Sequence, residues 1–136
     1  MPVLLLDSSV ALSLAFEDEC DDYTLRVFEA IRKGGALVPS LWFLEVANIL
    51  ALSVKRKRLT EPEAERFLLL LSAQQIQTAP DIDHRATDLY ALALHYNLTA
   101  YDAVYLNLAN KSGLPLASKD SALKNATVEA GLTLFL

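Results

Sequence analysis

Short apolar runs that alternate with longer amphipathic stretches set the pattern of this chain. A run of three or four apolar residues that stops at a polar residue or a turn is typical of a strand buried on both faces of a parallel sheet. Such runs predict strands at residues 3–6, 36–38, 114–117 and 132–135, and residues 75–78 form a further predicted strand.

The stretches between these strands carry apolar residues at the three- and four-residue spacing of helices. The predicted helices span residues 8–16, 23–33, 41–56, 60–71, 83–96 and 99–112, with a short seventh helix after residue 120. Strands and helices therefore alternate, and the sequence predicts an α/β fold in which helices flank a central, mainly parallel sheet.

Local signals mark several helix ends. Thr60 and Glu63 form a capping box, in which each residue satisfies a free backbone N–H of the other. Ser40 and Asp83 are expected N-caps, because their side-chain oxygens can accept hydrogen bonds from the first turn. Gly113 is the expected stop of the helix before it.

Length and composition indicate one core and a cytoplasmic location. The chain has 136 residues, 53% of them hydrophobic, which suits a single domain over residues 1–136. No apolar run approaches the roughly 18 residues that cross a bilayer, so we expect no membrane contact. The N-terminus lacks the basic region of a signal peptide. Cys20 is the only cysteine, which excludes an internal disulfide and a cysteine zinc site.

Four acidic residues occupy unusual places in this pattern. Asp7 directly follows the first predicted strand, where burying an unpaired carboxylate is costly and where α/β folds open into their ligand crevice. Asp120 follows a later strand, and Asp102 lies in the first turn of a helix. Glu45 interrupts an apolar helix, with Asn48 three residues later on the same face.

Each acid also has a structural interpretation. Asp102 can be the acid of a capping box begun by Thr99, and Asp120 can be a turn or N-cap residue. Taken together, four acids at element ends favour a shared site. Clustered carboxylates repel one another, so a cation must neutralise them or some must hold protons. Oxygen ligands suit Mg²⁺ or Mn²⁺. The expected catalytic and metal-binding residues are Asp7, Glu45, Asp102 and Asp120.

Four segments carry these acids in a distinctive context. They are residues 4–9 (LLLDSS), 39–48 (PSLWFLEVAN), 98–109 (LTAYDAVYLNLA) and 114–120 (LPLASKD). In this order and spacing they resemble the motifs of PIN-domain ribonucleases, and most of all the VapC toxins of type II (VapBC) toxin–antitoxin systems. The resemblance covers nearly the whole chain, and each of the four family acids has a counterpart here.

The resemblance implies a metal-dependent endoribonuclease that leaves 5′-phosphate and 3′-hydroxyl ends. Mg²⁺ or Mn²⁺ would be held by the four acids, with Ser8, Asn48 and Ser118 as supporting donors. It further implies a small VapB-like antitoxin, whose apolar helix and basic tail occupy a groove of the toxin. A homodimer formed through the helices after Pro39 and Thr60 is also implied.

The negative net charge of the chain affects how it can bind RNA. A net charge of −5 argues against binding through bulk positive charge, although bound metal offsets part of it. One basic run can contact phosphates, or it can be a solvated helix end whose charge suits the helix dipole. Its residues are Lys55, Arg56, Lys57 and Arg58. The aromatic residues Trp42, Tyr101 and Tyr105 can stack on bases or pack in the core.

Three other interpretations differ in their requirements. A receiver-type regulatory domain needs two adjacent acids after the first strand, and a haloacid-dehalogenase-type phosphatase needs Asp-x-Asp there. Serines follow Asp7 instead. A non-catalytic PIN-like module that binds RNA or protein stays open, and metal-dependent cleavage of RNA separates it from the enzyme.

Overall fold

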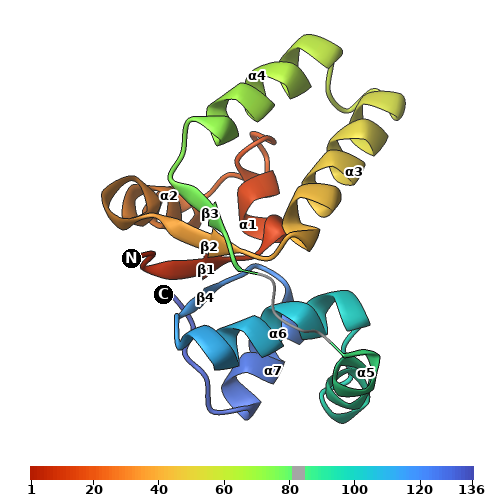
Figure 1. Cartoon of the computed structure of the whole chain (residues 1–136). Helices are drawn as coiled ribbons and strands as arrows, with labels where there is room; N and C mark the ends of the chain where they lie inside the picture. Colours follow the sequence, from red (N-terminus) through yellow and green to blue (C-terminus); the bar gives the residue numbers. More distant parts are fainter. Residues whose placement is uncertain (81–84) are drawn as a thin grey trace.

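A four-stranded parallel sheet forms the centre of the structure, a computed structural model that describes residues 1–80 and 85–136 (Figure 1). The described strands are β1 (Leu4–Leu6), β2 (Ala36–Val38), β3 (Ile76–Thr78) and β4 (Leu116–Ala117), in the order β3-β2-β1-β4. In the central strand, Leu5 pairs with Leu37 of β2 on one side and with Leu116 of β4 on the other. The predicted parallel sheet is confirmed.

Helices cover both faces of this sheet. They are α1 (Ser8–Ser13), α2 (Asp22–Gly34), α3 (Leu41–Lys55), α4 (Glu61–Ser72), α5 (Ala86–His95), α6 (Ala100–Ser112) and α7 (Ser121–Glu129). In Figure 1, α1 to α4 lie on one side of the sheet and α5 to α7 on the other. The α/β fold predicted from the alternating pattern is therefore confirmed.

Burial explains why the central strand is an uninterrupted apolar run in the sequence. Leu4, Leu5 and Leu6 are completely buried, since helices cover both faces of the central strand. A strand in this position has no solvent face and therefore no alternation of apolar and polar residues. The edge strand β3 differs, because Gln77 and Thr78 are exposed while Ile76 packs against the core.

Two of the helix ends predicted from the sequence are found in the structure, and one predicted N-cap is not. The capping box of Thr60 and Glu63 is present, and Gly113 ends α6 at a φ of +70°. Ser40 stands at the N-cap position of α3, but its φ and ψ of −57° and −30° are helical and its side chain makes no cap. The extended backbone that an N-cap needs is missing there.

Two other expectations have different outcomes. Residues 132–135 do not form a strand; they make a single bridge, between Leu134 and Leu116 of β4. The predicted cap Asp83 lies outside the described residues, and α5 is described from Ala86. In the described part of the chain, no helix combines the length and the apolar character needed to cross a membrane.

Candidate active site

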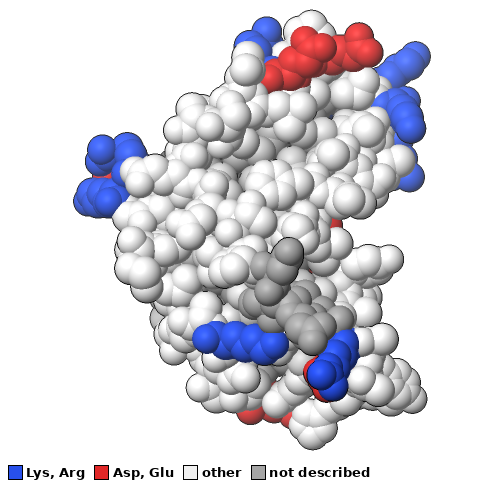
Figure 2. Space-filling model, in the orientation of Figure 1, with Lys and Arg blue, Asp and Glu red and all other residues white. Residues whose placement is uncertain are grey.

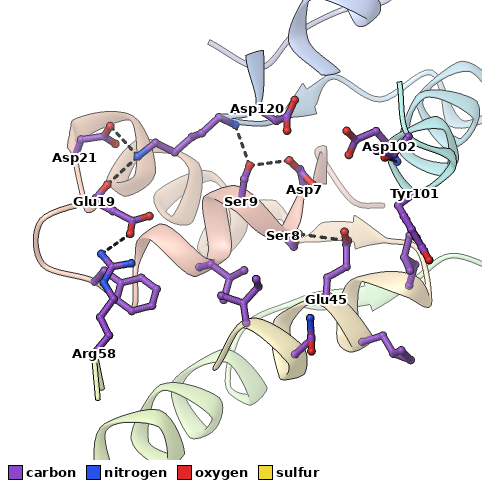
Figure 3. A pocket seen from close by; sticks show the side chains of 18 of the residues that line it. Asp7, Ser8, Ser9, Glu19, Asp21, Glu45, Arg58, Tyr101, Asp102 and Asp120 are labelled. Atoms are coloured by element: carbon purple, nitrogen blue, oxygen red, sulfur yellow. Dashed lines mark hydrogen bonds and ion pairs between the residues drawn. The ribbon is translucent and has the colours of Figure 1, made fainter. Parts of the chain in front are cut away.

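The four predicted acids line one pocket at the carboxyl-terminal edge of the sheet. This pocket has a volume of about 1140 Å³. Asp7 enters it from the end of β1, Glu45 from the second turn of α3, Asp102 from the first turn of α6 and Asp120 from the segment after β4. Figure 3 shows their carboxylates directed toward a common space. Segments far apart in the sequence therefore converge on one acidic site.

Asp7 is the most deeply buried of these acids, with 4% of its surface exposed. Its Oδ2 accepts hydrogen bonds from the hydroxyls of Ser9 at 2.7 Å and Ser118 at 2.8 Å. Burial raises the pKa of the Asp7 carboxyl, the two hydroxyl hydrogen bonds oppose this rise, and the nearby Asp120 carboxylate adds to it. The two serines thus hold one oxygen of a carboxylate that forms no ion pair with any residue in the described part of the chain.

Glu45 is held in the same manner from two other elements. Its Oε1 accepts from the Tyr105 hydroxyl at 2.5 Å and from the Ser8 hydroxyl at 3.3 Å. Burial raises the pKa of Glu45, and the charge of Asp7 adds to the rise. Among the described residues, no donor bonds to its Oε2. One oxygen of Glu45 is therefore committed to the protein, and the other is left for a ligand.

The charges of all three other acids affect the pKa of Asp102. Burial raises its pKa to about 6, with further contributions from the charges of Asp120, Asp7 and Glu45. The cap of α6 is provided by Thr99, whose side chain accepts from the Asp102 backbone N–H at 3.1 Å. The capping role considered from the sequence thus belongs to the Thr99 side chain, and the Asp102 carboxylate lines the pocket.

Asp120 combines both roles considered from the sequence. Its Oδ1 accepts from the backbone N–H of Leu123 at 2.9 Å, which caps α7, and its side chain also lines the pocket. The Asp120 backbone N–H donates to the Ser118 hydroxyl at 3.0 Å, and that hydroxyl donates to Asp7. Ser118 therefore connects the two acids that follow β1 and β4.

Two supporting residues were missed by the sequence analysis. Ser9 and Tyr105 donate to Asp7 and Glu45, as the predicted donors Ser118 and Ser8 do. The position of Ser9, two residues after Asp7, could have indicated it. Tyr105 could have been found from its place one turn after Asp102. The third predicted donor, Asn48, lines the pocket but takes no part in these hydrogen bonds among the described residues.

The basic run contributes one residue to the pocket. Arg58 lines it, whereas the lining does not include Lys55, Arg56 or Lys57. The Arg58 guanidinium forms ion pairs with Asp18 at 3.0 Å and Glu19 at 2.6 Å, and it lies 3.8 Å above the Phe16 ring.

A second pocket cation, Lys119, was missed by the sequence analysis. Its amine forms an ion pair with Asp21 at 3.0 Å and donates to the carbonyl oxygen of Glu19 at 2.8 Å. Arg58 and Lys119 are thus both tied to the acidic connection between α1 and α2. Figure 3 shows Arg58, Glu19 and Asp21 at one side of the pocket.

The donor chemistry fits a hard divalent cation. The four acids offer only oxygen, the ligand type that Mg²⁺ and Mn²⁺ prefer. Repulsion from neighbouring carboxylates contributes to the raised pKa values of Asp7, Glu45 and Asp102, and a bound cation reverses that effect. Within residues 1–80 and 85–136, no three His, Cys, Asp or Glu side chains form a ready-made metal cluster. The fit therefore rests on donor type and charge.

Known proteins resemble this chain over most of its length. A family model described as PIN domain matches residues 4–129. A protein named Ribonuclease VapC3, from Pyrobaculum aerophilum, is 31% identical over an alignment of 124 residues, and this alignment covers 88% of this chain and 91% of that protein.

Solved structures share the fold at lower sequence identity. PAE2754 from Pyrobaculum aerophilum has a TM-score of 0.68 at 24% identity, covering 92% of this chain and 84% of that protein. FitAcB from Neisseria gonorrhoeae has a TM-score of 0.63 at 13% identity, covering 98% and 96%. A toxin–antitoxin complex from Klebsiella pneumoniae has a TM-score of 0.58 at 18% identity, covering 87% of each chain.

Proposed function

Because the chain belongs to the PIN domain family, we propose that it is a metal-dependent endoribonuclease and the toxin of a toxin–antitoxin pair. The observation that carries this proposal is the convergence of four carboxylates from four separate segments on one pocket. Their oxygen donors and their combined negative charge suit the binding of Mg²⁺ or Mn²⁺ beside an RNA phosphate. The name of the 31% identical relative, a ribonuclease, supports the same reaction.

Each acid has a distinct part in this proposal. Asp7, Glu45 and Asp102 are the principal metal ligands, and Asp120 completes the set or orients the attacking water. When bound, the metal supplies a site for the scissile phosphate, a more acidic water and charge stabilisation of the leaving oxygen. The buried hydroxyls around Asp7 and Glu45 keep these carboxylates from rotating away from the pocket.

RNA binding is proposed to rely on a few local contacts. Figure 2 shows a largely uncharged face on which Lys and Arg lie in separate small groups, so this face offers no continuous positive surface. Arg58 and Lys119 are the cations that line the pocket, and Tyr101, 65% exposed at its edge, can stack on an unpaired base. Trp42 and Tyr105 are buried, and the structure removes them as stacking candidates.

The antitoxin is proposed to cover the pocket and the apolar surface beside it. Leu44 and Ile49 of α3 are exposed and line the pocket, and Phe43 is exposed nearby on the same helix. Seven of the lining residues are Asp or Glu and two are Lys or Arg, a balance that attracts a basic peptide. An apolar segment followed by a basic one matches this surface.

The deciding experiment measures cleavage of a labelled single-stranded RNA by the purified chain. We expect cleavage with Mg²⁺ or Mn²⁺, no cleavage in EDTA, and products with 5′-phosphate and 3′-hydroxyl ends. A chain that binds the RNA without cutting it under any of these conditions is instead the non-catalytic binding module. Mapping RNA ends in cells after brief expression then identifies the natural target.

A further inference from the structure

Helix α6 contains a completely buried tyrosine whose hydroxyl reaches the pocket acids. Tyr105 has 0% of its surface exposed and its ring belongs to the hydrophobic core. It lies one turn after Asp102, so both residues project from the same part of α6. Its hydroxyl donates to Glu45 Oε1 at 2.5 Å. A core aromatic residue and a pocket acid are thus directly joined.

Core packing explains the ring but not the hydroxyl. Phenylalanine fills a buried site of this shape without a polar atom, whereas a buried phenol must find a hydrogen-bond partner. Here the partner is a carboxylate of the pocket, and a hydrogen bond to an ionised carboxylate is stronger than one between neutral groups. The hydroxyl therefore acts on Glu45.

This hydrogen bond joins elements that otherwise share little packing. Among the described helices, α3 and α6 are not major packing partners, and they lie on opposite sides of the sheet in Figure 1. Tyr105 links Glu45 of α3 to the helix that carries Asp102. Ser8 of α1 donates to the same Oε1, so the Glu45 carboxylate is fixed from two directions, and no described residue donates to its Oε2.

We infer that Tyr105 is a positioning residue, which holds Glu45 in the orientation needed to bind metal next to Asp102. This inference rests on the proposed function, because it concerns how one of the proposed metal ligands is oriented. Tyr105 does not line the pocket and touches neither RNA nor metal in this role. Tyr105 affects metal binding only by orienting Glu45.

The test compares Tyr105→Phe with Tyr23→Phe. Each change removes one hydroxyl that donates a hydrogen bond, since Tyr23 donates to the Phe135 carbonyl oxygen at 2.8 Å and does not line the pocket. Mn²⁺ affinity is measured by calorimetry without RNA, alongside thermal denaturation. We expect Tyr105→Phe to weaken Mn²⁺ binding by about 10-fold or more, as is typical for lost support of a metal ligand. We expect Tyr23→Phe to leave the affinity unchanged.

Two further measurements separate positioning from stability. At a temperature where thermal denaturation shows parent and Tyr105→Phe both fully folded without metal, raising the Mn²⁺ concentration should restore much of the RNA cleavage lost in Tyr105→Phe. Under that condition the loss and its recovery are not due to unfolding. In a Glu45→Gln background, adding Tyr105→Phe should have no further effect on Mn²⁺ affinity, because the two residues act as one unit. Equal and independent effects in both backgrounds overturn the inference.

The remaining outcomes distinguish this inference from the proposed function. If the parent chain binds Mn²⁺ and Tyr105→Phe binds it equally well, the positioning role is wrong and the proposed function stands. If the parent chain neither binds Mn²⁺ nor cleaves RNA, the proposed function is wrong and the role of Tyr105 falls with it.

Discussion

At the residue scale, Asp102 offers the sharpest test of the acidic site. Asp102→Asn keeps the shape of the side chain and leaves the Thr99 cap of α6 in place. A neutral amide is a much poorer ligand for a hard divalent ion. We expect RNA cleavage to fall by more than about 100-fold, beyond the roughly 10- to 100-fold typical of a lost supporting hydrogen bond. Stabilisation by added Mg²⁺ or Mn²⁺ should disappear as well.

A matched control exists on the neighbouring helix. Asp88 lies at the third position of α5, as Asp102 does in α6, but it is exposed and does not line the pocket. Asp88→Asn should retain cleavage and metal-dependent stabilisation. If Asp102→Asn cleaves RNA at the parent rate with unchanged metal dependence, Asp102 does not belong to the site.

The raised pKa of Asp102 also predicts a pH dependence of stability. In the folded, metal-free chain this pKa is about 6, compared with an ordinary value of 3.8. A raised carboxyl pKa means that ionisation opposes folding, so stability is lost as the pH rises from about 4 through 6. Asp102→Asn removes this loss.

Thermal denaturation in EDTA between pH 4 and pH 7 measures the effect. We expect the melting temperature of Asp102→Asn to exceed that of the parent by a margin that grows as the pH rises. Asp88→Asn serves again as the comparison. A margin that stays constant or shrinks over this range contradicts the electrostatic account.

At the scale of elements, Asp120 links the capping of α7 to the pocket. Asp120→Asn should keep the cap, because asparagine is as good an N-cap as aspartate, while removing a pocket charge. Asp120→Ala loses both, and we expect it to lower the free energy of unfolding by about 0.5–2 kcal/mol. Both variants should cleave RNA more slowly than the parent.

Urea denaturation and an RNA cleavage assay separate these two effects. Thr60→Ala removes the cap of α4, whose residues are not among those that line the pocket, and should lower stability without slowing cleavage. If Asp120→Asn cleaves at the parent rate, Asp120 is a capping residue only.

Elements of this fold could be predicted where burial controls the local sequence. The runs at Leu4–Leu6 and Ala36–Val38 are buried on both faces, so they contain no polar residue and are visible as strands. Residues 132–135 show the opposite case. Leu132, Leu134 and Phe135 pack against the core, yet they pair with the sheet at a single bridge. An apolar run predicts that a segment is buried, but it does not predict that the segment pairs as a strand.

The acids of the pocket could be predicted from the sequence, as could two of their hydrogen-bond donors, Ser8 and Ser118. A carboxylate that follows a buried strand or interrupts an apolar helix stands out, which is how Asp7 and Glu45 were identified. Tyr105 did not stand out, because its partner Glu45 is 60 positions away and a buried tyrosine fits an ordinary core. The same reason applies to Lys119, whose ion-pair partner lies in the distant acidic connection.

At the scale of the whole molecule, three exposed leucines on α4 allow a test of self-association. Leu68, Leu69 and Leu70 have 46%, 70% and 46% of their surfaces exposed. A homodimer through α3 and α4, which the resemblance to PIN-domain ribonucleases implies, would bury them. Leu69→Glu should therefore shift the mass measured by light scattering from dimer to monomer, since a buried unpaired charge is costly.

Leu94→Glu provides the comparison for this prediction. Leu94 is 67% exposed on α5, on the other side of the sheet, so a charge there should leave the dimer intact. A monomeric parent chain, or equal behaviour of the two variants, would argue against the α4 surface.

The central place of β1 also determines when the site can form during protein synthesis. Ser118 donates to Asp7 across 111 positions of sequence, and β1 pairs with β4 only after that part of the chain exists. Chains leave the ribosome N-terminus first, and pairings between distant segments form slowly. An unfinished chain has no assembled pocket. The ribosome that makes this protein is therefore not exposed to its proposed nuclease activity until the last strand is in place.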